Sequence, residues 1–267
     1  MSAHSAFPFP VRRSVKACLA ATFGAMAAGV TGLPAQANPP ETAPIELRQL
    51  IENIDAAASA GDIDAVMEFY SSDFVHDDGL TRSSLRSALQ ALWERFPNLT
   101  YDTELLSWEE TATGYEAQTQ TTIEGTENAP HREYDLSATL QSRQQYENGQ
   151  IVFQEILTEL AMLTSGDAPP TLQVSLPERV TPNSRYNFDV IVEEPLDDDF
   201  LLGSAIEEVV SVENYLSETE LELELLSAGG LFKVGQSDRS EGDYWVSGAI
   251  VRQGGISIVT QRMKVKK

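Results

Sequence analysis

Apolar positions along the first part of this chain recur every three or four residues, and this spacing predicts amphipathic helices. Three helices are expected between residues 45 and 97. Gly61 closes the first helix and Asp62 caps the second, while Thr81 opens the third, which ends before Pro97. The apolar faces would carry Leu47, Leu50, Ile51, Ile54, Ile63, Val66, Met67, Tyr70, Leu85, Leu89, Leu92 and Trp93.

From residue 99 the apolar pattern changes to a period of two, which is typical of β-strands. Four strands are expected at 99–106, 114–123, 134–146 and 151–163, with a tight turn at Glu147-Asn148-Gly149. Beyond residue 170 the alternation continues in about seven shorter runs, and this predicts an all-β, immunoglobulin-like sandwich. These runs are 172–176, 186–192, 200–212, 221–225, 231–234, 244–246 and 255–265.

Small residues, a glycine and a proline pair interrupt the pattern at residues 164–170. Such a segment is typical of a linker, so the chain is expected to form two domains, 45–163 and 171–267, each with its own core. Charge also changes there. Residues 38–170 carry six arginines, no lysine and 24 acidic residues, so most of the acid excess belongs to the first domain.

The first 37 residues have the features of a signal peptide. Arg12, Arg13 and Lys16 form a positive region before an apolar run at 17–33, and Ala35-Gln36-Ala37 is a cleavage sequence. Cleavage after Ala37 predicts a secreted or periplasmic protein with no membrane span in the mature chain. Residues 38–44 are expected to form a disordered leader.

Cleavage would remove Cys18, the one cysteine of the chain, so neither a disulfide nor a thiolate metal site is expected. It would leave 15 basic and 41 acidic residues, a net charge of −26. The electrostatic field of this negative charge repels nucleic acid, which is therefore not expected as a partner. In a eukaryotic host, Asn98-Leu99-Thr100 would be a glycan acceptor.

Residues Gly61 to Gly79 read GDIDAVMEFYSSDFVHDDG, with a helical segment before them and SLRSALQALWERFP and four strands after them. This order resembles the NTF2-like (SnoaL-like) superfamily over residues 45–163. The resemblance implies an α+β fold, the NTF2-like cone, in which a curved antiparallel sheet wraps onto N-terminal helices around a pocket. The fold expected for the whole chain is this cone followed by an all-β immunoglobulin-like sandwich. The superfamily includes isomerases, dehydratases, ligand binders and dimerisation modules, so the resemblance implies no particular reaction.

In the ketosteroid isomerase branch of this superfamily, an aspartate after the second helix is the general base, and the resemblance places it at Asp77. His76 beside it suggests a base oriented by a carboxylate, as in a hydratase or dehydratase. The branch's two donors fall on Ile54 and on Gln141 or its neighbour Ser142, and these substitutions remove its strongest stabilisers of an enolate oxygen. The other interpretation is that His76, Asp77 and Asp78 cap and solvate a loop. Besides His76 the sequence holds only His4 and His131, so neither a metal nor a cofactor is expected.

An apolar ligand pocket is expected where the elements of the first domain converge. Its wall would be formed by Tyr70, Phe74, Trp93, Phe96, Tyr134 and Phe153, with Thr121, Gln141 and Glu155 as sparse polar groups. Core filling is the other explanation for each aromatic side chain. Alternation would place Ile151, Phe153, Glu155 and Leu157 on one strand face, so Glu155 would be either desolvated or paired with an arginine.

These patterns favour an exported, non-catalytic binding or assembly module with a pocket for a small apolar ligand. The alternative is a SnoaL-like enzyme, of isomerase or hydratase/dehydratase type, that uses His76 and Asp77 on a small carbonyl or hydroxyl compound. A third reading is a structural partner of an envelope protein, with a sheet face forming a homodimer. The acidic run Glu193–Asp199 offers oxygen ligands for Ca²⁺, and charge repulsion in a solvated turn also explains it.

Overall fold

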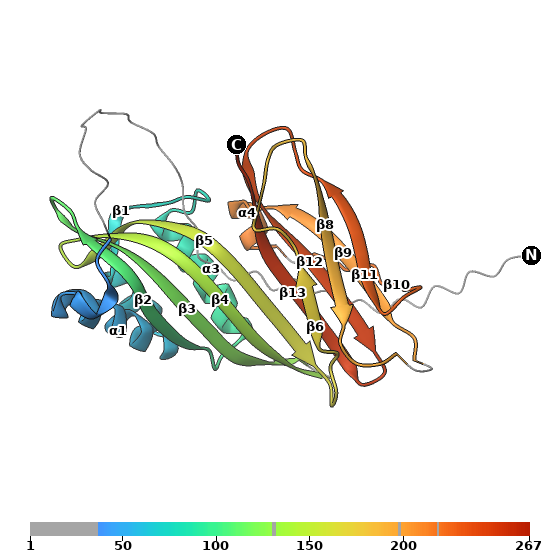
Figure 1. The fold of residues 1–267 in the computed structure, drawn as a ribbon. Coiled ribbons are helices and arrows are strands. Elements are labelled where there is room, and N and C mark those ends of the chain that lie inside the picture. Colours follow the sequence, from blue (N-terminus) through green and yellow to red (C-terminus); the bar gives the residue numbers. More distant parts are fainter. Residues whose placement is uncertain (1–36, 130–131, 197–198, 218) are drawn as a thin grey trace, which may run out of the picture.

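The computed structural model describes residues 37–267 except 130–131, 197–198 and 218. Figure 1 shows the order of the elements along the chain. They are η1 (Pro40–Thr42), α1 (Ile45–Ser59), α2 (Ile63–Glu68), β1 (Tyr70–His76), α3 (Arg82–Arg95), β2 (Thr100–Glu110), β3 (Gly114–Ala129), β4 (Arg132–Glu147), β5 (Gln150–Ser165), β6 (Leu172–Ser175), β7 (Arg179–Val180), β8 (Arg185–Val192), β9 (Leu202–Val209), α4 (Val212–Tyr215), β10 (Glu224–Leu225), β11 (Gly230–Gln236), β12 (Gly242–Arg252) and β13 (Gly255–Val265).

Local sequence signals mark the end of α1 and the starts of α2 and α3 where they were expected. Gly61 has a φ of 66°, and the Asp62 side chain accepts a hydrogen bond from the Ala65 amide at 3.0 Å. Thr81 and Ser84 form a reciprocal capping box at the start of α3. The turn before β5 is also confirmed, since Asn148 and Gly149 both have positive φ.

The second helix is shorter than its apolar pattern suggested. It ends at Glu68, and Tyr70 onwards forms β1, which pairs in parallel with β5. The Arg82 guanidinium stabilises this junction between α2 and β1, because it donates to the carbonyl oxygens of Met67 at 2.6 Å and of Tyr70 at 3.0 Å. Those hydrogen bonds satisfy the end of α2 and hold the start of β1 against α3.

One ten-stranded sheet runs through both halves of the described chain. Eight of its strands lie in the order β10-β9-β12-β13-β5-β4-β3-β2, while β1 pairs with β5 and β7 pairs with β13 beside them. β5 joins the two halves. Its first part pairs with β1, from Ile151 to Gln154, and its last part pairs with β13, from Leu160 to Ser165. β1 and β13 therefore occupy the same edge of β5 in succession, and the sheet continues into the C-terminal half where β1 ends.

The predicted fold class, an α+β NTF2-like cone followed by a separate immunoglobulin-like sandwich, is wrong. The described residues are mostly antiparallel β, with 54% strand and 19% helix, and they are built on one large sheet rather than on an α+β cone and a separate sandwich. The helices and most strands lie near their expected positions. The error concerns how the strands associate, because the pairing of β5 with β13 merges the two expected units.

Two segments expected to be loose are held in place. Residues 164–170 were expected to be a linker, but β5 continues to Ser165, and a Cβ at Gly166 would lie 2.4 Å from the Gly254 carbonyl oxygen. The expected disordered leader, residues 38–44, is ordered as well. The Asn38 amide donates to the Trp108 carbonyl at 2.7 Å, which attaches this segment to β2.

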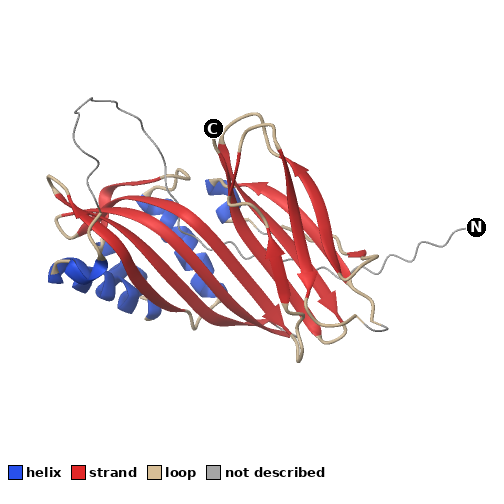
Figure 2. Ribbon diagram, viewed as in Figure 1, coloured by secondary structure: helices blue, strands red, loops and turns tan. Residues whose placement is uncertain are grey.

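Helices and a second sheet cover different faces of the long sheet (Figure 2). We call the face against α1 and α3 the inner face, and its apolar side chains form two core clusters with those helices. The opposite, outer face of β12 and β13 packs against a three-stranded sheet, β11-β8-β6. Gly248 permits this contact, because a Cβ there would lie 3.0 Å from both Phe188 and Val190 side chains.

Candidate functional site: an aromatic cavity containing a carboxyl group

A cavity of about 50 Å³ lies between the helices and the inner face of the sheet. It is lined by residues of α1, α2, α3 and the strands β1 to β4, so it is formed where the helices pack on the sheet. The lining residues are Ile51, Ile54, Asp55, Ala58, Val66, Tyr70, Leu89, Trp93, Tyr101, Thr103, Thr121, Gln144 and Tyr146. Most of these side chains are aliphatic or aromatic, and this is the composition of a site for a small, largely apolar molecule.

Asp55 supplies the carboxyl group of the cavity. It is half-buried on α1 and accepts hydrogen bonds from the Thr103 amide at 2.8 Å and the Thr103 hydroxyl at 2.7 Å. Burial raises the pKa of Asp55, against the lowering effect of these two bonds. The Thr103 hydroxyl also lies 2.9 Å from that of Thr121, so the carboxyl is held by a short polar ladder across β2 and β3.

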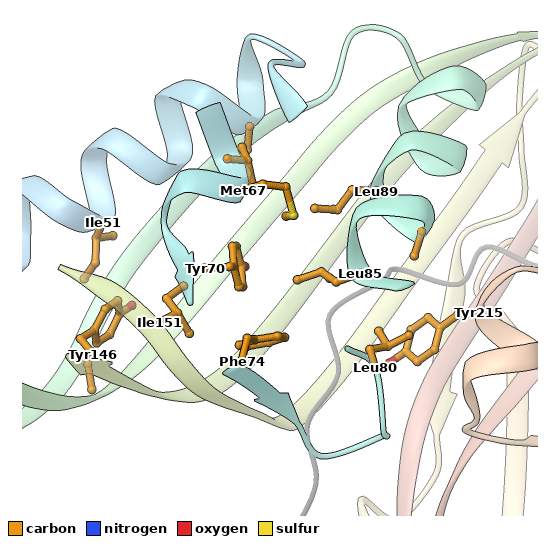
Figure 3. Close-up of a cluster of buried hydrophobic side chains, with 14 of the residues drawn as sticks. Ile51, Met67, Tyr70, Phe74, Leu80, Leu85, Leu89, Tyr146, Ile151 and Tyr215 are labelled. Atoms are coloured by element: carbon orange, nitrogen blue, oxygen red, sulfur yellow. The ribbon is translucent and has the colours of Figure 1, made fainter. Parts of the chain in front are cut away.

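Four aromatic side chains from different elements complete the wall: Tyr70 of β1, Trp93 of α3, Tyr101 of β2 and Tyr146 of β4. Figure 3 shows Tyr70 and Tyr146 among the apolar side chains between the sheet and the helices. The Trp93 indole donates to the Tyr101 hydroxyl at 2.9 Å, and the Tyr146 hydroxyl donates to the Gln144 side chain. These bonds fix the rings, so the cavity is preformed rather than collapsed.

The structure separates the residues that were predicted to line the pocket. Tyr70, Trp93 and Thr121 do line the cavity. Phe74 packs in the neighbouring core, with its ring 4.9 Å from that of Tyr70, and Phe96 and Tyr134 belong to the second core cluster. Gln141 points to the outer face, where its amide donates to the Gln120 side chain at 3.1 Å.

A bulge in β5 redirects the other two predicted residues, Phe153 and Glu155. Ile151 lies opposite Tyr146, whereas Phe153 lies opposite Gln145. Gln145 and Tyr146 are adjacent in β4, so they point to opposite faces of the sheet. Their partners Ile151 and Phe153 therefore do so too, and the expectation that these two share a face is wrong.

Glu155 lies opposite Arg143 and forms an ion pair with it. The Lys264 ammonium lies 3.3 Å from the same carboxylate. Of the two expectations for Glu155, the pairing with an arginine is the one observed. Glu155 and Phe153 therefore belong to the outer face, away from the cavity.

His76 and Asp77 do not form a catalytic pair. The His76 side chain is 1% exposed in the core, its ring is 5.5 Å from that of Phe74, and among the described residues neither ring nitrogen has a hydrogen-bond partner. Burial and the nearby Arg262 charge lower the pKa of His76 to about 2. Asp77 is on the other side of the chain, where burial and the charge of Glu155 raise its pKa to about 6.

Asp78, by contrast, is part of a buried ionic cluster that joins the two halves of the protein. Arg262 of β13 is the centre of this cluster, with its side chain 1% exposed. Its guanidinium contacts Asp78 at 2.8 Å, Glu159 at 3.1 Å and Asp243 at 3.0 Å. Tyr215 and Trp245 donate to Asp78 and Glu159, respectively. Because the carboxylates already have these partners, the cluster is a structural cross-link.

Sequence reasoning missed Asp55, although a signal was present. Leu47, Ile51 and Asp55 are spaced four residues apart, so the carboxyl lies on the apolar face of α1. It also directly follows Ile54, the position to which the resemblance carried a donor. Tyr101 and Tyr146 have only the strand alternation as a signal, and that alternation does not tell a cavity wall from a packed core.

Some predicted features fall partly or wholly on residues that the structure does not describe. These are the leader with His4 and Cys18, His131, and Asp197 and Asp198 of the acidic run. In the described part of that run, the Glu194 carboxylate accepts from the Thr171 amide at 3.0 Å, and Asp199 pairs with Arg252 at 2.6 Å.

Over the described ranges, no three or more histidine, cysteine, aspartate or glutamate side chains are arranged to hold a metal ion. In the same ranges, no helix is both long and apolar enough to cross a bilayer.

Comparison with known proteins gives one family match. Residues 167–266 match the model of a domain of unknown function, DUF8623. This span begins within the expected linker and covers β6 to β13. A search of curated proteins found no match. The resemblance of residues 45–163 to the NTF2-like superfamily stays a prediction.

Proposed function

We propose that this protein is an exported, non-catalytic binding module that holds a small ligand with an apolar body in the cavity beneath α1 and α3. The observation that supports this most directly is the cavity itself, about 50 Å³ of space walled by aromatic and aliphatic side chains with one carboxyl group. Cores normally pack without such spaces, and a preformed apolar cavity with a few polar groups is typical of ligand sites.

The positions of the candidate catalytic residues favour binding over catalysis. A general base must reach the proton that it abstracts. His76 is enclosed in the core and Asp77 lies on the opposite side of the strand, so neither lines the cavity. The leader at residues 1–37 supports a secreted or periplasmic location.

Cavity filling tests this proposal. Ala58 lines the cavity and is 7% exposed, whereas Ala56 of the same helix is exposed. Binding of a panel of neutral and charged compounds of about six to eight non-hydrogen atoms would be measured by calorimetry on the mature chain. For every compound that binds the parent protein, we expect Ala58→Leu to weaken binding by at least about tenfold and Ala56→Leu to leave it unchanged.

Two results would refute the proposal. One is a panel in which no compound binds the parent protein. The other is binding that Ala58→Leu leaves unaltered while the thermal unfolding midpoint shows that the variant is folded.

A further inference from the structure

The Asp55 carboxyl group is held inside the cavity by neutral hydrogen-bond donors. Its two hydrogen bonds come from Thr103, and no lysine, arginine or histidine among the described residues lies within ion-pair distance of it. By comparison, Glu155, Glu159 and Asp78 all have cationic partners in the same protein. Proteins pair buried charges, so a carboxyl group in an apolar wall without a counter-ion suits a ligand that brings the positive charge.

The aromatic walls favour the same charge. Tyr70, Trp93, Tyr101 and Tyr146 surround the space that Asp55 faces. The π-face of an aromatic ring is electronegative, and several rings together bind an alkylated ammonium group, which cannot form strong hydrogen bonds. A primary ammonium has three donors and a guanidinium has five, whereas Thr103 already donates to both oxygens of the Asp55 carboxylate.

The size of the cavity fits the head of such a compound. A single water needs about 10–15 Å³ of cavity volume, so about 50 Å³ holds roughly three to five groups of that size. A trimethylammonium head has four non-hydrogen atoms, three of them methyl groups that match the apolar wall. The remainder of the ligand would extend between α1 and β2, where Asp55, Tyr101 and Thr103 are only partly buried.

The charge of the protein would draw a cation to the site. Residues 38–170 contain six arginines, no lysine and 24 acidic residues. A field of this sign raises the local concentration of cations and speeds their association. Burial raises the pKa of Asp55 in the absence of ligand, and a bound cation would favour its ionised form.

We infer that the ligand of this cavity carries a small alkylated ammonium group, held by the Asp55 carboxylate within the cage of Tyr70, Trp93, Tyr101 and Tyr146. This inference rests on the proposed binding function. It adds the chemical class of the ligand, a quaternary or tertiary amine with a short substituent.

A pair of isosteric probes separates the inference from the proposed function. Choline and 3,3-dimethyl-1-butanol share a quaternary centre with three methyl groups and a hydroxyethyl arm, and they differ in charge. Their affinities would be measured by calorimetry on the mature chain at moderate salt. We expect choline to bind at least about tenfold more tightly, the size of a hydrogen bond or ion contact to a charged group.

Variants then assign the preference to the cage. Asp55→Asn keeps an acceptor for Thr103, and it should reduce the preference for choline to the part that the rings supply, while binding of the neutral probe persists. Asp102→Asn removes the same charge from an exposed neighbour and should retain the preference. Trp93→Leu should weaken choline binding by about threefold to tenfold through the lost ring.

The outcomes are distinct. Equal affinity for both probes, or tighter binding of the alcohol, overturns the inference and leaves the proposed function standing. A preference for choline that Asp55→Asn leaves undiminished in a folded variant also overturns it. Failure of both probes and of the wider panel overturns the proposed function, and the inference falls with it.

Discussion

Replacing His76 by phenylalanine should remove a large part of the acid sensitivity of this protein. The His76 ring is buried, and burial together with Arg262 lowers its pKa to about 2, whereas the unfolded chain has the ordinary value of 6.5. Between these two values the unfolded state binds one more proton than the folded state, so stability falls as pH falls below about 6.5. Stability is unaffected by this group at higher pH.

The expected magnitude follows from the two pKa values. Each pH unit below the unfolded pKa removes about 1.4 kcal/mol. Between about pH 7 and about pH 5 the wild type should therefore lose about 2 kcal/mol through His76, and His76→Phe should lose none by this route. Phenylalanine keeps a ring beside Phe74, so the comparison isolates the proton rather than the packing.

The assay is urea unfolding followed by tryptophan fluorescence at a series of pH values, for both proteins. Asp77 contributes with the opposite sign. Its folded pKa is raised from 3.8 to about 6, so its protonation favours the folded state as pH falls through that range. The difference between wild type and variant cancels this contribution. Parallel stability curves for the two proteins would refute the reasoning, because they would mean that His76 is protonated in the fold without cost.

Three further predictions concern the joined architecture. Arg262→Met leaves Asp78 and Glu159 buried without their cation, and it should lower the free energy of unfolding by about 3–5 kcal/mol. A loss below about 1 kcal/mol in urea unfolding would contradict the structural role of the cluster. Gly166→Ala should lower the unfolding midpoint more than Gly149→Ala. Both glycines have positive φ, but only at Gly166 would the new Cβ lie 2.4 Å from a carbonyl oxygen. Equal shifts in the midpoint would be inconsistent with that packing. Residues 38–166 expressed alone should aggregate, since β5 would expose the edge that β13 covers, and a monomeric, well-dispersed NMR spectrum would count against a shared sheet.

Most local elements of this protein can be predicted from short-range sequence signals. Asp62 and Thr81 mark helix starts because their side chains bond amides only three residues away. Asn148-Gly149 specifies its turn because these residues tolerate positive φ. Such signals depend on neighbours in the chain, so they can be read without the fold. The apolar stripe of α1, with Asp55 in it, is local in the same sense.

The way in which these elements combine depends on long-range packing. An alternating pattern indicates that a segment can form a strand, but it does not indicate which other strand it pairs with. The pairing of β5 with β13, which begins at Ser165 and Ile256 and merges the two expected units, could therefore not be predicted from the sequence. The bulges of β5 turned Phe153 and Glu155 to the outer face, because one extra residue reverses every later side chain of a strand. The cavity has the same origin. Asp55 and its four aromatic neighbours come from separate elements, and three-dimensional packing alone brings a carboxyl group and those rings around one space.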